Sequence, residues 1–132
     1  MMKSSLHSAD RIRYESSVTF DSLCMPGVRY SLYRMSFGRR TDLAHKVLEL
    51  SRKLEFLGAG ETVKEKVEAA LVNTEIERLY IQWGLKAIEG LEIDGSEATV
   101  ESLIESGPEA LATEIVRRIQ SECGVSEAER KN

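Results

Sequence analysis

The chain has 132 residues, of which 42% are hydrophobic and 30% are charged, and its formal net charge is −4. This length suits one domain that buries roughly two-thirds of its unfolded surface. The composition excludes a disordered or fibrous chain. No apolar run approaches the ~20 residues of a transmembrane helix, and the N-terminus has no apolar signal core. We therefore expect one domain in the cytoplasm, without membrane contact.

The charge is divided unevenly along the chain. Residues 1–40 hold seven Lys or Arg against three Asp or Glu, and the remainder holds eleven against nineteen. The basic residues Arg29, Arg34, Arg39 and Arg40 are spread over an expected strand and loop rather than along one helix. Nucleic-acid binding is therefore a weaker prediction than protein binding.

The two cysteines, Cys24 and Cys123, lie far apart in sequence and belong to no C-x-x-C pair. This pattern favours unpaired cysteines in a reducing compartment, although a disulfide between them stays open.

The first sixteen residues are rich in Ser and charge and have no periodicity, which predicts a flexible tail over 1–16. From Ser17 the residues alternate in the manner of a strand, and Pro26–Gly27 is typical of a type II turn. Val28, Tyr30 and Leu32 would then share one face. We predict a β-hairpin over about 17–37, at the start of a single globular domain over 17–132.

A helix is predicted next, because leucines and a valine recur at spacings of four and three. Thr41 or Asp42 would cap its start, and Gly58–Gly60 would end it. The inward stripe comprises Leu43, Val47, Leu50, Leu54 and Leu57.

A second helical region opens where Thr62 and Glu65 have capping-box spacing. Its inward residues would be Val63, Val67 and Leu71, followed by Ile76, Leu79, Tyr80 and Trp83. Thr74 and Glu77 form a second capping box, which leaves two alternatives. Either one helix runs unbroken to about Gly90, or a bend near Asn73 separates two shorter helices.

The last third is expected to hold a turn and two helices. Asp94–Gly95 is a turn dipeptide, a short helix follows, and Gly107–Pro108 opens the last helix. Arg117 and Arg118 would lie near the C-terminal end of this helix, where positive charge interacts favourably with the helix dipole. Inward residues would be Val100, Leu103 and Ile104 in the short helix and Leu111, Ile115 and Ile119 in the last one. Gly124 would end that helix, and Ser126 with Glu129 forms another capping box.

The predicted fold class is mainly α: a compact domain of four to five helices over about 41–125 with an N-terminal β-hairpin, or α+β by strict count.

Residues for chemistry are scarce. His45 lies on the polar side of its helix without a Cys or His at ligand spacing. Gly58–Glu61 follows a helix, unlike a dinucleotide-binding loop, which follows a strand. The segment after Asp94 has too few oxygen ligands for a calcium loop. We expect a non-enzymatic protein with no cofactor and no metal.

Apolar residues around the single tryptophan are the remaining functional candidates. There are more of these apolar side chains than one narrow stripe along a helix can place in a core. Aromatic residues are also common in protein interfaces. The candidate partner-binding residues are Tyr80, Trp83, Leu85, Ile88 and Leu91. A sole Trp in a small domain is also typical of a core, so both interpretations of Trp83 stay open.

From residue 74 onward the sequence resembles the small tail assembly chaperones of long-tailed bacteriophages and prophages. The resemblance is carried by Trp83, the Asp94–Gly95 turn, the segment ATVESLIESGPEALATEIVRRI and the terminal Lys131–Asn132. It extends over residues 74–132 and does not include the hairpin.

The resemblance implies a non-enzymatic partner of the tape measure protein in the cytoplasm of a bacterial host. Such a chaperone keeps apolar helices of the tape measure protein soluble until tail-tube protein replaces it, and a longer frameshifted form exists in such families. Two alternatives remain. One is a generic helical adaptor or homo-oligomer that uses the Leu43–Leu57 stripe, and the other is a small DNA-binding regulator that uses the basic hairpin.

Overall fold

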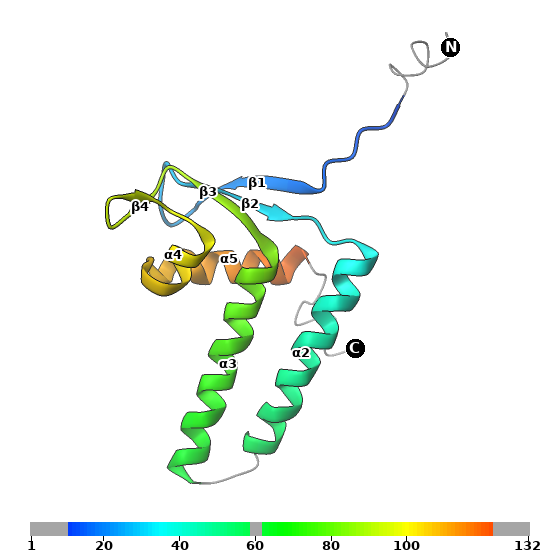
Figure 1. Ribbon diagram of the computed structural model, residues 1–132, viewed down its shortest axis with the longest axis vertical. Coiled ribbons are helices and arrows are strands. Elements are labelled where there is room, and N and C mark those ends of the chain that lie inside the picture. The colour runs from blue at the N-terminus through cyan, green and yellow to red at the C-terminus, as the bar shows by residue number, and fades with distance from the viewer. Residues whose placement is uncertain (1–10, 59–61, 123–132) are drawn as a thin grey trace.

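The predicted hairpin forms in the computed structural model, which describes residues 11–58 and 62–122 (Figure 1). Strand β1 (Ser17–Asp21) pairs antiparallel with β2 (Arg29–Tyr33). The connection contains the expected type II turn: Gly27 has φ +96°, and Val28 N–H donates to the Met25 carbonyl at 3.0 Å. Tyr30 and Leu32 are buried, as their shared face predicts.

A third strand was not predicted. Residues Leu85–Glu89, expected to continue a helix, form β3, which pairs antiparallel with β2 and completes a sheet of order β1-β2-β3. A bulge between Ser31 and Leu32 shifts the register. It allows Leu85 and Ile88, three residues apart, both to be buried, which strict alternation of a strand would prevent. The helix interpretation of this segment is therefore wrong, because the free edge of β2 binds the segment instead.

Helices α2 (Phe37–Gly58) and α3 (Val63–Gly84) extend from the sheet as a pair (Figure 1). Helix α2 begins four residues before the predicted cap: Ser36 Oγ accepts from Arg39 N–H at 3.3 Å. The Thr62 cap of α3 is confirmed, since Thr62 Oγ1 accepts from Glu65 N–H at 3.1 Å. Helix α3 is unbroken at Asn73 and ends at Gly84 rather than Gly90.

The last third has the predicted turn and two helices, and it also contains two short strands that were not predicted. Strands β4 (Glu92–Ile93) and β5 (Ser96–Glu97) form a short hairpin around Asp94–Gly95. Helix α4 (Val100–Ser106) has a capping box of Thr99 and Ser102, and Pro108 directly precedes α5 (Glu109–Glu122). Residues 11–58 and 62–122 thus contain four helices and a three-stranded sheet, which confirms a mainly helical α+β fold.

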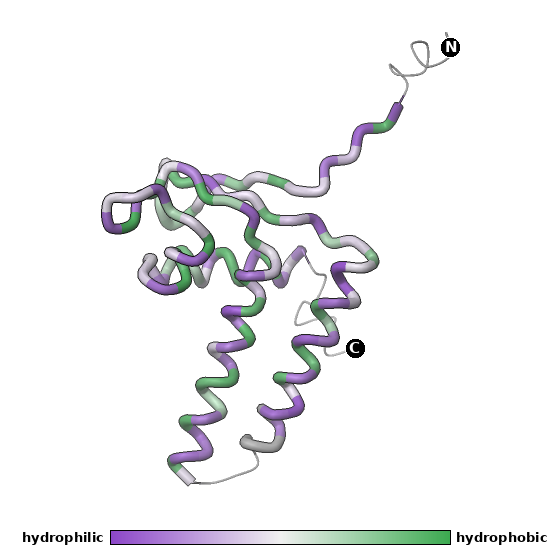
Figure 2. The backbone as a smooth tube through the Cα atoms, viewed as in Figure 1, coloured by the Kyte–Doolittle hydropathy of each residue, from purple (hydrophilic) through white to green (hydrophobic). Residues whose placement is uncertain are grey.

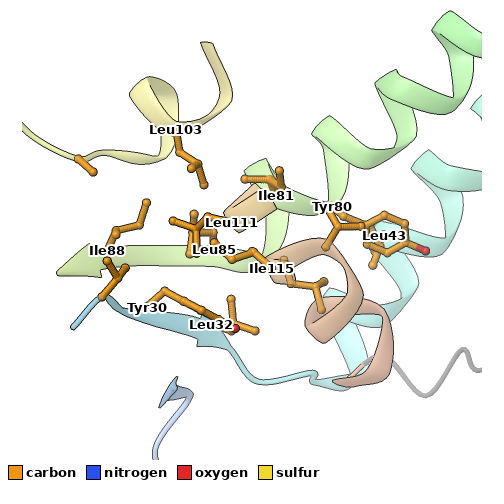
Figure 3. Packing of buried hydrophobic residues seen from close by; sticks show 14 residues of the cluster. Tyr30, Leu32, Leu43, Tyr80, Ile81, Leu85, Ile88, Leu103, Leu111 and Ile115 are labelled. Carbon is orange, nitrogen blue, oxygen red and sulfur yellow. The ribbon is translucent and has the colours of Figure 1, made fainter. Parts of the chain in front are cut away.

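The hydrophobic core lies where α5 crosses the sheet and meets α3 and α4 (Figure 3). Leu111 and Ile115 of α5 are fully buried, and Ile119 is 3% exposed, as predicted. Leu103 of α4 closes one side of this core, and Tyr80 and Leu43 continue it between α3 and α2.

The inward stripe predicted for the start of α3 is wrong. Val63, Val67 and Leu71 are exposed, whereas Val72 is buried. In α2, Leu43 is buried and Val47 packs against the core. The side chains of Leu54 and Leu57 lie outside the described residues, as do Ala59, Gly60, Cys123, Gly124 and the Ser126 box.

Gly90→Ala should destabilise the fold much more than Gly95→Ala. Both glycines have positive φ, +82° and +84°, but a Cβ at Gly90 would also collide with the Gly27 carbonyl, whereas Gly95 faces open space. We expect a loss of about 2–4 kcal/mol at Gly90 and about 1 kcal/mol at Gly95. Urea denaturation measures the loss of stability in both variants. Equal losses would contradict a close contact between Gly90 and the Gly27 carbonyl.

Candidate functional site

One face of α3 is apolar and uncovered. Val63, Val67 and Leu71 are 77%, 53% and 58% exposed and recur every four residues, so they form a continuous stripe. Val72, the next residue along the helix, is buried. Figure 2 shows hydrophobic residues recurring along α3 as far as its N-terminal end. We call this stripe the α3 face.

The α3 face continues into a groove between α3, α4 and α5. Thr74 and Ile81 follow Val67 on the same side of α3, and both line this groove, whose volume is about 420 Å³. Its apolar lining includes Leu103 and Val116. Helices α4 and α5 therefore cover only the C-terminal end of the face, and the N-terminal half has no covering element among the described residues.

The rim of the groove is charged. Arg78 and Glu105 form an exposed ion pair with an N–O distance of 3.1 Å, and Glu77 and Glu109 also line the groove. An apolar floor with a polar rim is the usual anatomy of a protein-binding groove.

The sequence-predicted partner residues lie elsewhere. Tyr80, Leu85 and Ile88 are buried in the core, so a partner does not reach them in this fold. Trp83 and Leu91 are partly buried and pack against the same core. A partner contact for these two residues stays a prediction.

Trp83 takes part in a cation–π sandwich instead. The Arg39 guanidinium lies 4.2 Å from the Trp83 ring centroid and 4.4 Å from that of Tyr33, and it donates a hydrogen bond to the Trp83 carbonyl. The sandwich joins the end of β2, the start of α2 and the end of α3. Arg39, which the DNA-binding alternative would place on nucleic acid, here stacks on two rings and binds a backbone carbonyl.

Glu114 ties α5 to the hairpin loop. Its carboxylate accepts from the Tyr30 hydroxyl at 2.6 Å, from the Ser22 hydroxyl at 3.1 Å, and from the backbone N–H groups of Leu23 and Cys24. Arg118 Nε donates to the Tyr30 oxygen at 2.9 Å. Neither Arg117 nor Arg118 lies in the last turn of α5 as described, so the predicted interaction with its C-terminal dipole is wrong.

These contacts shift two pKa values in opposite directions. Burial alone would raise the pKa of Glu114, but hydrogen bonds from Tyr30, Cys24 and Leu23 outweigh burial and lower the pKa to about 2. Burial, followed by the hydrogen bond to Glu114, raises the pKa of Tyr30 to about 12. Sequence reasoning missed this network, and its one visible signal was the four-residue spacing of Glu114 and Arg118 beside the apolar stripe.

The other chemical candidates stay dispersed. Cys24 is exposed, and His45 is an exposed residue of α2. Within residues 11–58 and 62–122, no three His, Cys, Asp or Glu side chains gather at metal-binding distance. The Gly58–Glu61 loop lies largely outside these residues.

No protein-family model, curated protein or solved structure matches the chain. None of the described helices has the length and apolar character that crossing a membrane requires. The fold and the site thus define a mainly helical α+β protein in which no described element covers the N-terminal half of the apolar α3 face.

Arg39→Lys should destabilise the protein by about 1–2 kcal/mol, because an ammonium group keeps the charge but not the planar stacking on two rings. Urea denaturation measures the loss, and the Trp83 emission should shift as its ring environment changes. Arg52→Lys, at an exposed position of α2, should change stability by less than about 0.5 kcal/mol. Equal effects of the two variants would contradict the sandwich.

Glu114→Gln should cost on the order of 1–3 kcal/mol at pH 7, because it weakens four hydrogen bonds to a carboxylate. Since folding lowers the Glu114 pKa from 4.5 to about 2, its stabilisation is complete above pH 4.5 and is lost as the pH falls toward 2. The stability gap between wild type and variant should therefore shrink below pH 4.5.

Urea titrations at several pH values test this dependence. Glu122→Gln, an exposed position on the same helix, serves as the control and should change little at any pH. A gap that is constant from pH 7 to pH 2.5 would contradict the role given to Glu114.

Proposed function

We propose that the protein is a non-enzymatic chaperone that binds amphipathic helical segments of a larger client along the α3 face. The observation that carries the proposal is the exposure of Val63, Val67 and Leu71 on a surface that runs into a groove lined by both apolar and polar residues. Recognition of a helix in a groove uses such a row of apolar contacts at helical spacing.

The family resemblance suggests the client. A tape measure protein is a long helical molecule, and its helices would present matching apolar stripes before tail-tube protein assembles around them. In this proposal the protein acts in the cytoplasm of the bacterial host. Modest affinity for each of many equivalent client segments would permit release during assembly.

The alternative of a DNA-binding regulator has less support. Arg39 is stacked between two rings, and Arg29 pairs with Asp21 at 3.4 Å. These contacts engage two of the four basic residues on which that alternative depended.

The test is binding to fragments of the tape measure protein encoded beside this chain. Val67→Glu combined with Leu71→Glu should weaken binding about ten- to a hundredfold, because a charge replaces apolar contacts at the centre of the face. Isothermal titration calorimetry measures the affinity, and circular dichroism checks that the variant folds.

A matched control places the same two charges on another helix. Ala44→Glu combined with Leu48→Glu alters two exposed positions of α2, also four residues apart, and affinity should stay within about twofold of wild type. If no tape measure gene neighbours this one, or if both variants bind equally, the proposal fails.

A further inference from the structure

The chain enters β1 through an arm, residues 11–16, that leads away from the domain (Figure 1). All six residues are exposed, and Ile12 and Tyr14 are 96% and 68% exposed. Within residues 11–58 and 62–122, residues 11–15 take part in no hydrogen bond or ion pair. Two large apolar side chains and a stretch of backbone are therefore open to a partner.

The sequence of the arm alternates in the manner of a strand. Ile12 and Tyr14 would point to one side, and the charged residues Arg11, Arg13 and Glu15 would point to the other. The arm runs directly into β1 and keeps the same period of two. It thus has the pattern of a strand, but no strand of its own sheet lies beside it.

Strand β1 has a free outer edge. Arg34 N–H donates to the Ser16 carbonyl at 2.8 Å, and six residues later Ser22 N–H donates to the Val28 carbonyl at 2.8 Å. Even-numbered residues of this strand therefore direct their backbone groups toward β2, and odd-numbered residues direct theirs away from it. The outward N–H and carbonyl groups belong to Ser17, Thr19 and Asp21.

The two edges of the sheet differ in their protection. Strand β3 carries the exposed charges of Lys86 and Glu89, and the bulge in its ladder makes that edge irregular. Strand β1 has the sequence SVTFD, which is rich in strand-favouring residues and contains neither Pro nor Lys. Charges, prolines and bulges are the usual devices that keep an edge from pairing. The edge of β1 is therefore the one open to another strand.

The arm of a second copy fits this edge in an antiparallel register. A two-fold axis at Ser16 places Ile12 of each copy opposite Phe20 of the other, and Tyr14 opposite Val18. Odd-numbered residues then face odd-numbered residues, as the outward backbone groups of β1 require. The pairing is isologous, since the same eleven residues, 11–21, contribute from both copies.

The added side chains continue the apolar rows on the core side of the sheet. Phe20, Tyr30 and Ile88 are paired across β1, β2 and β3, and Ile12 of the other copy becomes the fourth member of this row. Tyr14 extends the neighbouring row in the same way. Aromatic and β-branched pairs of this kind stabilise adjacent strands.

The charges on the outer side of the sheet also match. Glu89, Arg29 and Asp21 form a row of alternating sign across the three strands, and Arg29 Nε lies 3.4 Å from the Asp21 carboxylate. Arg11 of the other copy lies opposite Asp21 and continues the alternation. Arg13 of the other copy lies diagonally to the same carboxylate.

One pair of like charges approaches in this register. The two Glu15 side chains are diagonal neighbours across the axis, and each lies opposite Ser17 of the other copy. Lys86 Nζ donates to the Ser17 hydroxyl at 3.4 Å. Each Glu15 carboxylate is therefore placed beside a lysine of the other copy, which offsets the repulsion.

We propose that two copies of the chain join through their arms and β1 edges into one six-stranded antiparallel sheet. Six hydrogen-bonded residue pairs supply about twelve main-chain hydrogen bonds, which lies within the roughly 5–15 of a typical protein interface. Main-chain bonds give affinity to such added strands, and alternate side chains give specificity. The bend at Ser16 straightens on pairing. The α3 face takes no part, so the dimer is independent of the proposed function.

Cysteine crosslinking tests the register in the full chain with Cys24→Ser and Cys123→Ser. Ser16→Cys places two thiols at the axis, where the Cα atoms are about 4.5 Å apart, and should give a disulfide dimer under mild oxidation. Arg13→Cys is the control on the same arm, because its thiols would be about 20 Å apart. Crosslinking at position 13 as fast as at position 16, or at neither position, would overturn the proposal.

A proline in the arm tests the main-chain hydrogen bonds by sedimentation velocity. Glu15→Pro removes an N–H that is directed at Ser17 of the other copy, and it should weaken the dimer about tenfold or more. Glu15→Ala removes the same side chain but keeps the N–H, so its dimerisation should stay within about threefold of wild type.

Neither variant should change the melting temperature of the monomer, because Glu15 makes no hydrogen bond or ion pair within the described chain. Equal association of the proline and alanine variants would contradict pairing through the arm.

A variant of the α3 face separates this dimer from the proposed function. Val67→Glu with Leu71→Glu should associate like wild type, because neither residue lies on the sheet. Loss of association in this variant would assign the contact to α3 and overturn the edge pairing. A wild-type chain that stays monomeric up to about 1 mM would overturn it as well, and would leave client binding unaffected.

Discussion

Helix α5 holds the fold together because it contacts both the sheet and α3. Leu111 and Ile115 are fully buried between them, and Ile119 packs so closely on Gly84 that a Cβ there would lie 2.8 Å from the Ile119 side chain. This contact fixes the point at which α3 ends and the chain turns into β3. The Glu114 carboxylate then ties the same helix to the hairpin loop, so apolar packing and a polar network act on one element.

The sequence predicted the helices and the hairpin because their signals are local. Alternation and a Pro–Gly turn mark β1 and β2, and a stripe of Leu111, Ile115 and Ile119 marks α5. Strand β3 was missed because Leu85 and Ile88 have helical spacing, which only the bulge converts into a shared strand face. A pairing with β2 more than fifty residues away leaves no trace in a local window.

The exposed apolar α3 face was missed for a related reason. Helix α3 has two apolar faces, and periodicity shows that a face is apolar without showing which element covers it. Val63, Val67 and Leu71 were assigned to the core because they recur at helical spacing after a capping box, but α4 and α5 reach only as far as Thr74. Three of the residues that the sequence predicted to bind a partner, Tyr80, Leu85 and Ile88, are buried in the core.

An uncovered apolar face provides a limited free energy for binding. Full burial of a Val or Leu side chain contributes about 1.5–3 kcal/mol, and these side chains are already partly covered by their own helix. Three such residues therefore supply only several kcal/mol, much of which offsets the entropy lost on association. A surface of this kind favours exchange between partners over permanent assembly. In the proposed function, a series of client helices can then use the face in turn.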